Sequence, residues 1–186
     1  MISTSQFKNG ITIKIDGKLY AILEFQHVKP GKGGAFVRTK LKSISDGAII
    51  DKTFRASQTV EEAFIEEKKV NFIYRADEDY HFMDQTSYED IVVRDEMIAR
   101  AKGYLKENTE VTMAFHDGKI VGVILPNFVE LAVSYTEPGF RGNTVHGGSK
   151  PAKLETGLTI QVPLFINQGD IIKVDTRTGE YVGRVQ

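Results

Sequence analysis

Short runs of alternating apolar and polar residues, each closed by a turn, recur along the whole sequence. The first run places Ile11, Ile13 and Ile15 between polar residues and ends at the pair Asp16-Gly17. Two-residue turns of this composition typically join antiparallel strands, because aspartate and glycine tolerate the left-handed backbone that such turns need. The pattern therefore predicts hairpins, and 186 residues with 41% hydrophobic content are ample for their cores.

Turn signals and the pair Pro126-Asn127 divide these strands into three groups. The boundaries expected from them give domains at residues 1–63, 64–127 and 128–186. Each group has about 60 residues, which is the size of a small β-barrel. Modules this small bury little surface alone, so neighbours are expected to share buried contacts. The predicted fold class is all-β, with three small barrels.

One short helix is expected among the strands of the middle group. Asp95 precedes it, and an aspartate at that position can accept hydrogen bonds from the free N–H groups of a first helical turn. Four apolar residues are then expected on one side of the helix: Met97, Ile98, Ala101 and Leu105.

The most unusual turn consists of Lys29, Pro30, Gly31, Lys32, Gly33 and Gly34. Glycine and proline favour tight turns, and no carboxylate is close in the sequence. The Lys32 ammonium is therefore expected at the exposed tip of a hairpin, where it could reach into an RNA cleft or carry a covalent modification. A merely solvated lysine is the ordinary alternative. The turn is not a P-loop, which would have to run into a helix.

The strand after this turn alternates, with Arg38, Lys40 and Lys42 on one face and apolar or small residues on the other. We call these three cations the cationic ladder. No acidic residue interrupts residues 35–45. The ladder therefore predicts contact with RNA phosphates, and a solvated strand face is the competing interpretation.

The net charge of −1 conceals an uneven distribution. Residues 1–63 contain 10 Lys and Arg against 6 acids, residues 64–127 contain 8 against 13, and residues 128–186 contain 6 of each. Such a polarised chain is expected to contact RNA only locally. A general single-stranded nucleic-acid-binding protein is the alternative function. It would need aromatic residues along a cationic groove, and the acidic middle disfavours it.

Patterns typical of enzymes and metal sites are missing from the sequence. It has no cysteine, and its four histidines do not have metal-ligand spacing. We expect no catalytic residue, metal or cofactor. A Schiff-base role for Lys32 would need a desolvated pocket, which a glycine-flanked turn does not offer. The first residues lack an apolar signal region, and no apolar stretch is long enough for a bilayer, so a cytoplasmic protein without a membrane partner is expected.

Several segments, in order along essentially the whole chain, resemble the translation elongation factor P family. The tip with Ala35-Phe36-Val37-Arg38 resembles the modified-lysine loop of that family, and Tyr80-His81-Phe82-Met83-Asp84 resembles its middle-domain hairpin. The most specific matches are C-terminal: Lys150-Pro151-Ala152-Lys153-Leu154-Glu155-Thr156-Gly157, Val162-Pro163-Leu164-Phe165-Ile166 and Val174-Asp175-Thr176-Arg177.

The resemblance implies an SH3-like (KOW-like) barrel followed by two OB-fold barrels, in an L-shaped arrangement that mimics tRNA. It implies a monomeric factor, not an enzyme, that binds the 70S ribosome between the peptidyl-tRNA and exit sites. Such a factor contacts both subunits and their RNA, and promotes peptide bond formation when consecutive prolines stall synthesis. The elongation factor P-like paralogue is a close alternative, which the intact Pro30-Gly31-Lys32-Gly33 tip disfavours.

Roles of individual residues also follow from the resemblance. Lys32 corresponds to a lysine that a modifying enzyme extends, by β-lysyl or aminopentanol chemistry, toward the acceptor end of the peptidyl-tRNA. Arg141 and Gly142-Asn143-Thr144 correspond to a loop expected near the exit-site codon, where asparagine replaces the family's aspartate and loses its charge. Tyr181 and Arg184 match a pair expected near small-subunit RNA or the anticodon stem, where stacking and a phosphate contact are suitable.

Overall fold

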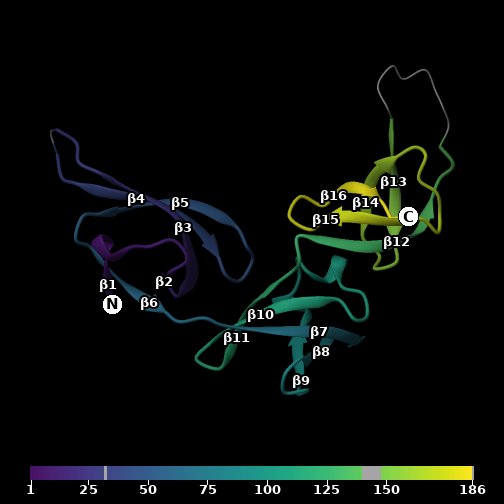
Figure 1. Cartoon of the computed structure of the whole chain (residues 1–186), viewed down its shortest axis with the longest axis horizontal. Coiled ribbons are helices and arrows are strands. Elements are labelled where there is room, and N and C mark those ends of the chain that lie inside the picture. Colours follow the sequence, from purple (N-terminus) through teal and green to yellow (C-terminus); the bar gives the residue numbers. More distant parts are fainter. Residues whose placement is uncertain (32, 140–147, 186) are drawn as a thin grey trace. The chain divides into compact units, whose positions relative to one another are not determined.

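The computed structural model describes residues 1–31, 33–139 and 148–185 (Figure 1). In this part of the chain, sixteen strands form three sheets, and the helices are three single 3-10 turns. All strand pairs with a stated register are antiparallel. The prediction of an all-β chain with three barrel-like sheets is confirmed.

The first sheet has six strands in the spatial order β1 (Ile2–Ser3), β6 (Thr59–Ala63), β2 (Thr12–Ile15), β3 (Lys18–Val28), β4 (Phe36–Ser43) and β5 (Ile49–Arg55). A 3-10 turn, η1 (Thr4–Gln6), follows β1. Asp16 and Gly17 join β2 to β3 with φ of 50° and 80°, so the predicted hairpin turn is confirmed. The core contains Ile22 and Leu41, both fully buried, and belongs to this sheet alone.

The middle sheet has five strands in the order β11 (Lys119–Ile124), β10 (Glu110–His116), β7 (Glu66–Ala76), β8 (Asp79–Asp84) and β9 (Asp90–Arg94). Its inner face is aromatic, because the Phe72 ring packs 5.4 Å from Phe82 and 5.8 Å from Tyr80, measured between centroids. All three side chains are buried. Asp77 and Glu78 form the turn between β7 and β8.

The prediction of a single helix after Asp95 is wrong. Two separate 3-10 turns, η2 (Asp95–Met97) and η3 (Lys102–Tyr104), occupy this segment, and the N-cap residue of η2 is Arg94, whose side chain makes no capping hydrogen bond. Asp95 instead accepts hydrogen bonds from the Tyr80 hydroxyl at 3.2 Å and from the Lys102 ammonium at 2.8 Å. The side chain ties the segment to the sheet rather than starting a helix.

Three of the four apolar residues expected on one side of this segment are buried. Its backbone hydrogen bonds run from Ile98 to Asp95 and from Ala101 to Ile98, three residues apart, and from Lys102 to Ile98, four residues apart. The segment is therefore a series of turns without one regular period. Ile98 and Ala101 are buried as predicted, together with Leu105, whereas Met97 is 45% exposed.

The third sheet has five strands in the order β14 (Thr159–Pro163), β13 (Ser149–Leu154), β12 (Phe128–Thr136), β15 (Ile171–Asp175) and β16 (Glu180–Arg184). Its two edge strands, β14 and β16, approach each other, so the sheet curves toward closure. Leu131, Leu154, Ile166 and Ile172 are fully buried in its core.

Contacts group the chain into two compact units, which combine residues 1–68 with 113–123 and residues 69–112 with 124–186. The middle sheet thus contributes strands to both units. The three-domain division at residues 1–63, 64–127 and 128–186 stays a prediction.

Gly122 on β11 leaves no room for a side chain, because a Cβ there would overlap the carbonyl oxygen of Ile44. A backbone atom cannot move aside as a flexible side chain can. We therefore expect Gly122→Ala to lower the free energy of unfolding by about 1–3 kcal/mol, measured by chemical denaturation. Gly183→Ala is the control, since a Cβ there meets nothing within 4 Å. Equal losses in both variants would contradict the overlap as the cause.

Candidate functional site

The strands β3 and β4 form a long hairpin whose last pair is Val28 with Phe36. β3 contains 11 residues, which corresponds to a length of ~36 Å. Figure 1 shows the loop at its end reaching beyond the other strands of the sheet. The loop residues that the structure describes before Ala35 are all exposed: Lys29, Pro30, Gly31, Gly33 and Gly34. Lys32 itself lies outside the described residues.

Glycines determine the shape of this loop. Gly33 has φ of 110°, a backbone conformation that residues with side chains rarely adopt. A Cβ at Gly31 or Gly34 would meet no atom within 4 Å, so these positions have open space around them. No atom from outside the loop lies within 4 Å of a Cβ placed on its described glycines, which leaves room for a large group beside them.

The cationic ladder has the predicted alternation. Arg38, Lys40 and Lys42 are exposed on β4, and the side chains between them are buried. The guanidinium of Arg38 lies 5.5 Å from the centre of the Phe36 ring, which holds it on the outer face near the loop.

Neighbouring strands bring acids beside the ladder that the sequence pattern did not reveal. Lys40 lies opposite Asp51 of β5, and its Nζ is 3.7 Å from the Glu24 carboxylate of β3. The side chains of Lys40 and Glu24 are both exposed, so their ion pair is weak in water. It still reduces the charge that Lys40 offers to a phosphate. On β5, Arg38 and Lys42 lie opposite uncharged residues, so the ladder is uneven.

Tyr181 and Arg184 lie three residues apart on β16, a spacing that puts side chains on opposite faces of a regular strand. A bulge changes this here. Tyr181 pairs with Val174 and Arg184 pairs with Ile172, which both belong to the core. The irregularity therefore brings Tyr181 and Arg184 to the same face of the sheet. The sequence gives no signal for it.

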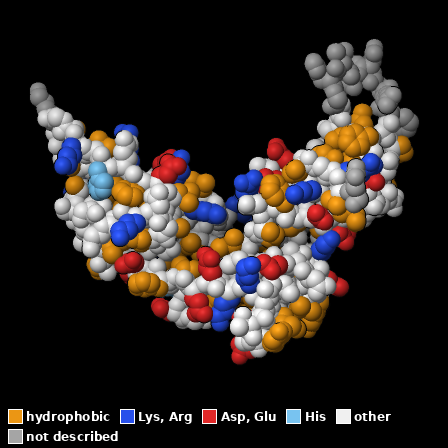
Figure 2. Space-filling view, in the orientation of Figure 1, with side chains coloured by type: hydrophobic (Ala, Val, Ile, Leu, Met, Phe, Trp, Pro, Cys, Tyr) orange, Lys and Arg blue, Asp and Glu red, His pale blue; other side chains and the backbone are white. Residues whose placement is uncertain are grey.

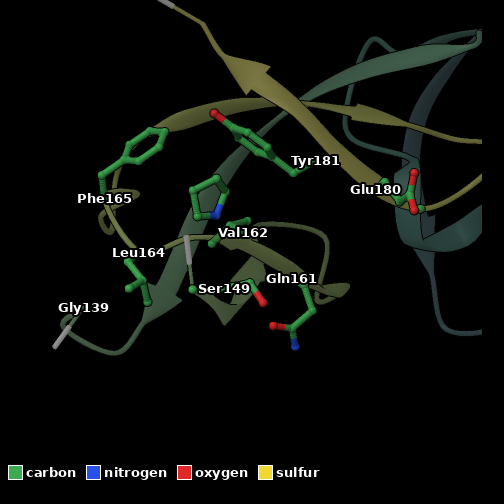
Figure 3. Close-up of a pocket in the computed structure, with 11 residues that line it drawn as sticks. Gly139, Ser149, Gln161, Val162, Leu164, Phe165, Glu180 and Tyr181 are labelled. Atoms are coloured by element: carbon green, nitrogen blue, oxygen red, sulfur yellow. The ribbon is translucent and has the colours of Figure 1, made fainter. Parts of the chain in front are cut away.

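Tyr181 also lines a cleft of about 930 Å³ in the third sheet. Figure 3 shows the rings of Tyr181 and Phe165 bordering one side of this cleft, with Ser149 and Gln161 on the other. Phe165 is 60% exposed, and aromatic faces of this kind can stack nucleobases. Phe165 belongs to a segment that resembles the family, but its sequence position did not mark it as a site residue. Arg141, Gly142, Asn143 and Thr144 lie outside the described residues.

The carboxylate of Asp175 holds the turn before β16. The sequence did not identify it as a group that positions other residues. Asp175 accepts hydrogen bonds from the backbone N–H of Arg177 at 2.9 Å and from its guanidinium at 3.0 and 2.5 Å. These side-chain hydrogen bonds, more than any other cause, lower the pKa of Asp175 to about 2. The Asp-Thr-Arg spacing could have signalled the pair, because residues two apart across a turn can meet.

Residues 1–31, 33–139 and 148–185 contain neither a metal-binding cluster nor a membrane-spanning helix. No group of three or more His, Asp or Glu side chains there could hold a metal ion. None of the helices in these ranges is long and apolar enough to cross a bilayer.

Family models match three successive parts of the chain. The elongation factor P KOW-like domain matches residues 3–60, the elongation factor P OB domain matches residues 65–123, and the elongation factor P C-terminal model matches residues 129–184. Together these matches cover nearly the whole sequence.

Full-length relatives are similar along the entire chain. Elongation factor P of Natranaerobius thermophilus is 54% identical over 186 residues, which are 100% of this chain and 99% of the relative. Elongation factor P of Coprothermobacter proteolyticus is 53% identical over 185 residues, which are 100% of both. A solved structure, eukaryotic translation initiation factor 5A from Methanococcus jannaschii, is 26% identical with a TM-score of 0.48, over 66% of this chain and 92% of that one.

Asp175→Asn tests the carboxylate that holds the β15–β16 turn. Because the pKa of Asp175 is lowered from 3.8 to about 2 in the folded chain, the charged form stabilises the fold above about pH 4. This contribution is lost as the pH falls through about 2. We expect the variant to melt at a lower temperature than the parent at pH 7, and the difference to narrow as the pH is lowered.

The matched control is Asp16→Asn, whose carboxylate is 91% exposed and 3.8 Å from the Lys52 ammonium. Its melting temperature should stay close to that of the parent throughout the pH series. A difference for Asp175→Asn that is constant with pH would contradict the role of its charge.

Proposed function

This chain belongs to the elongation factor P family of translation factors, and we propose that it binds the 70S ribosome between the peptidyl-tRNA and exit sites. There it promotes peptide bond formation when consecutive prolines stall synthesis. The ribosome performs the chemistry, and the factor is not an enzyme. It acts in the cytoplasm as a monomer, with ribosomal RNA of both subunits and the peptidyl-tRNA as its partners.

The observation that carries this proposal is the exposed glycine-rich loop at the end of the β3–β4 hairpin. The residues on both sides of position 32 are exposed, and no atom from outside the loop lies within 4 Å of a Cβ placed on the glycines beside it. A lysine in such a loop is accessible to a modifying enzyme and can extend toward another molecule. Lys32 is the proposed site of modification, and the extended side chain is the proposed contact with the acceptor end of the peptidyl-tRNA.

Positioning alone can account for the acceleration. Proline is a poor nucleophile, and its geometry strains the nascent chain. A group that holds the peptidyl-tRNA end in a reactive pose lowers the entropic part of the barrier, by as much as roughly 7–11 kcal/mol in the most favourable cases. Lys32 would then need no proton transfer or covalent step of its own.

Two further RNA contacts are part of the proposal. The cationic ladder binds phosphates close to the loop, with Arg38 and Lys42 contributing more than Lys40, since Glu24 lies 3.7 Å from the Lys40 ammonium. On the third sheet, the Tyr181 ring stacks on a base and Arg184 contacts a phosphate. The segment Arg141-Gly142-Asn143-Thr144 is the proposed contact near the exit-site codon.

Lys32→Ala is expected to abolish rescue of polyproline synthesis, because it removes the proposed site of modification and contact. Stability should change by no more than about 0.5 kcal/mol, as for other exposed turn positions. The measurement is translation of a Pro-Pro-Pro reporter beside a thermal melt. Lys18→Ala, at an exposed lysine at the other end of β3, is the control and should rescue normally. Normal rescue by Lys32→Ala would contradict the assignment of Lys32 as the site of modification and contact.

Alanine at all three ladder positions should weaken ribosome binding. It should also flatten the slope of log affinity plotted against log salt concentration. The slope should change by somewhat under one unit for each phosphate that the factor no longer neutralises. Among the single variants, Arg38→Ala and Lys42→Ala should flatten the slope more than Lys40→Ala. Rescue at saturating factor should fall far less than with Lys32→Ala. An unchanged slope in the triple variant would show the ladder to be an ordinary solvated face.

A further inference from the structure

The turn at Asn9 and Gly10 lies just before β2 and has no part in the contacts proposed above. Both residues are exposed. The Ile11 N–H donates to the Lys8 carbonyl at 3.3 Å, which closes the turn, and Gly10 has φ of 88°. Asn9 is therefore held at a corner of the chain that water can reach.

The residue after Asn9 makes this asparagine chemically distinct from the others. Asparagine followed by glycine is especially prone to deamidation, because glycine has no side chain to hinder the approach of its backbone nitrogen to the asparagine amide. The sequence has six asparagines, and Asn9 is the one that glycine follows. Two of the others are also held by side-chain hydrogen bonds, since Asn71 accepts from Gln85 at 2.9 Å and Asn167 donates to the Phe165 carbonyl at 3.2 Å.

The structure leaves space for the reaction at this turn. A Cβ placed on Gly10 would meet no atom within 4 Å, so there is room on that side for a ring to close and for water to enter. One contact opposes the reaction, because the Gly10 N–H donates to the Ile22 carbonyl at 2.8 Å and must be released before its nitrogen can attack. Exposed turns open locally at a small cost in free energy, so the folded chain can still react.

Asn9 also lines a hollow of about 650 Å³ on the first sheet, which it shares with two cations of the ladder. The lining includes Glu24 of β3 with Arg38 and Lys40 of β4. Figure 2 shows basic and acidic side chains intermingled over this sheet. Charges that share so small a hollow interact even at physiological salt, where screening acts over about 8 Å. A negative charge at position 9 would therefore reduce the attraction of the ladder for a phosphate.

We propose that Asn9 is a site of spontaneous deamidation, and that the carboxylate formed there weakens the contact of the ladder with phosphates. The first half depends on this chain alone, whereas the second half rests on the proposed function. The reaction needs only water, which supplies the oxygen of the new acid, and ammonia is the leaving group. The factor therefore loses affinity for the ribosome as it ages.

The reaction has two steps. The Gly10 backbone nitrogen bonds to Cγ of Asn9, the bond from Cγ to the amide nitrogen breaks, and that nitrogen leaves as ammonia with the proton that Gly10 gave up. Water then adds to one of the two carbonyl carbons of the succinimide ring and breaks its bond to the Gly10 nitrogen, which regains a proton. Opening at Cγ gives aspartate, and opening at the backbone carbon gives isoaspartate. Both products carry a negative charge at neutral pH that asparagine lacks.

Peptide mass spectrometry tests the reaction. The full-length protein is incubated in mildly alkaline buffer, where the backbone nitrogen loses its proton more readily, and is digested beside an unincubated sample. We expect the peptide with Asn9 to gain the mass that separates an acid from an amide, and to divide into aspartate and isoaspartate forms. The peptide with Asn108 is the internal control, because this exposed asparagine is followed by threonine. No conversion at Asn9, or equal conversion at both positions, overturns the proposal.

Two substitutions test the consequence for binding. Asn9→Asp supplies the charge of the product, and Asn9→Gln keeps an uncharged amide. At low salt we expect Asn9→Asp to lower the affinity for purified 70S ribosomes about two- to fivefold, and Asn9→Gln to bind as the parent does. Equal affinities of the two variants overturn the effect on binding. Thermal melts of both variants distinguish a defect in binding from a defect in folding.

The variant with alanine at all three ladder positions shows where the new charge acts. Adding Asn9→Asp to it should cause no further loss of affinity, and an undiminished loss would overturn the role of the ladder in the effect. If the parent does not co-sediment with ribosomes, the proposed function and the effect on binding both fail. The mass measurement still decides by itself whether Asn9 is deamidated.

Discussion

The hydrogen-bonded register between β3 and β4 is the constraint on which the candidate site depends. No atom from outside the loop lies against its described glycines, so the pairing that ends at Val28 and Phe36, with the hydrogen bond from the Ala56 N–H to the Ala35 carbonyl, fixes where the loop lies. The same register buries Val37 and Leu41 and exposes the cationic ladder. A slip of one residue would turn the ladder into the core and Leu41 into solvent, and the free energy of burying a charge forbids that arrangement. The core therefore determines where both the loop and the ladder lie.

Features that depend on neighbouring residues could be predicted from the sequence. Alternation along β4 gave its two faces, and Asp16-Gly17 gave the first hairpin, because each requires only local backbone and burial preferences. The segments around the tip and near the C-terminus gave the family. Features that depend on distant residues could not be predicted in this way. Glu24 and Asp51 lie beside Lys40 only after three strands pair. The three residues are too far apart in the sequence for one short window to contain them.

Irregularities of a single residue were the second limit on what could be predicted from the sequence. The bulge on β16 brings Tyr181 and Arg184 to one face, and strict alternation would have separated them. Likewise, separate turns replace the single helix expected after Asp95, and Met97 is exposed although Ile98 and Ala101 are buried as expected. Both deviations change the facing of one side chain with no change in composition. They matter for function because a pair of residues can act on one ligand only when both face it.

The charge of this chain differs from sheet to sheet. The ladder on β4 is cationic and suits the proposed contact with phosphates, whereas the turns at both ends of β8 are acidic and repel phosphates. A net charge of −1 therefore describes neither surface. The proposed contact of the ladder is electrostatic and weakens as salt rises. The proposed contact at the loop acts by positioning, so salt should affect how often the factor binds more than what it does once bound.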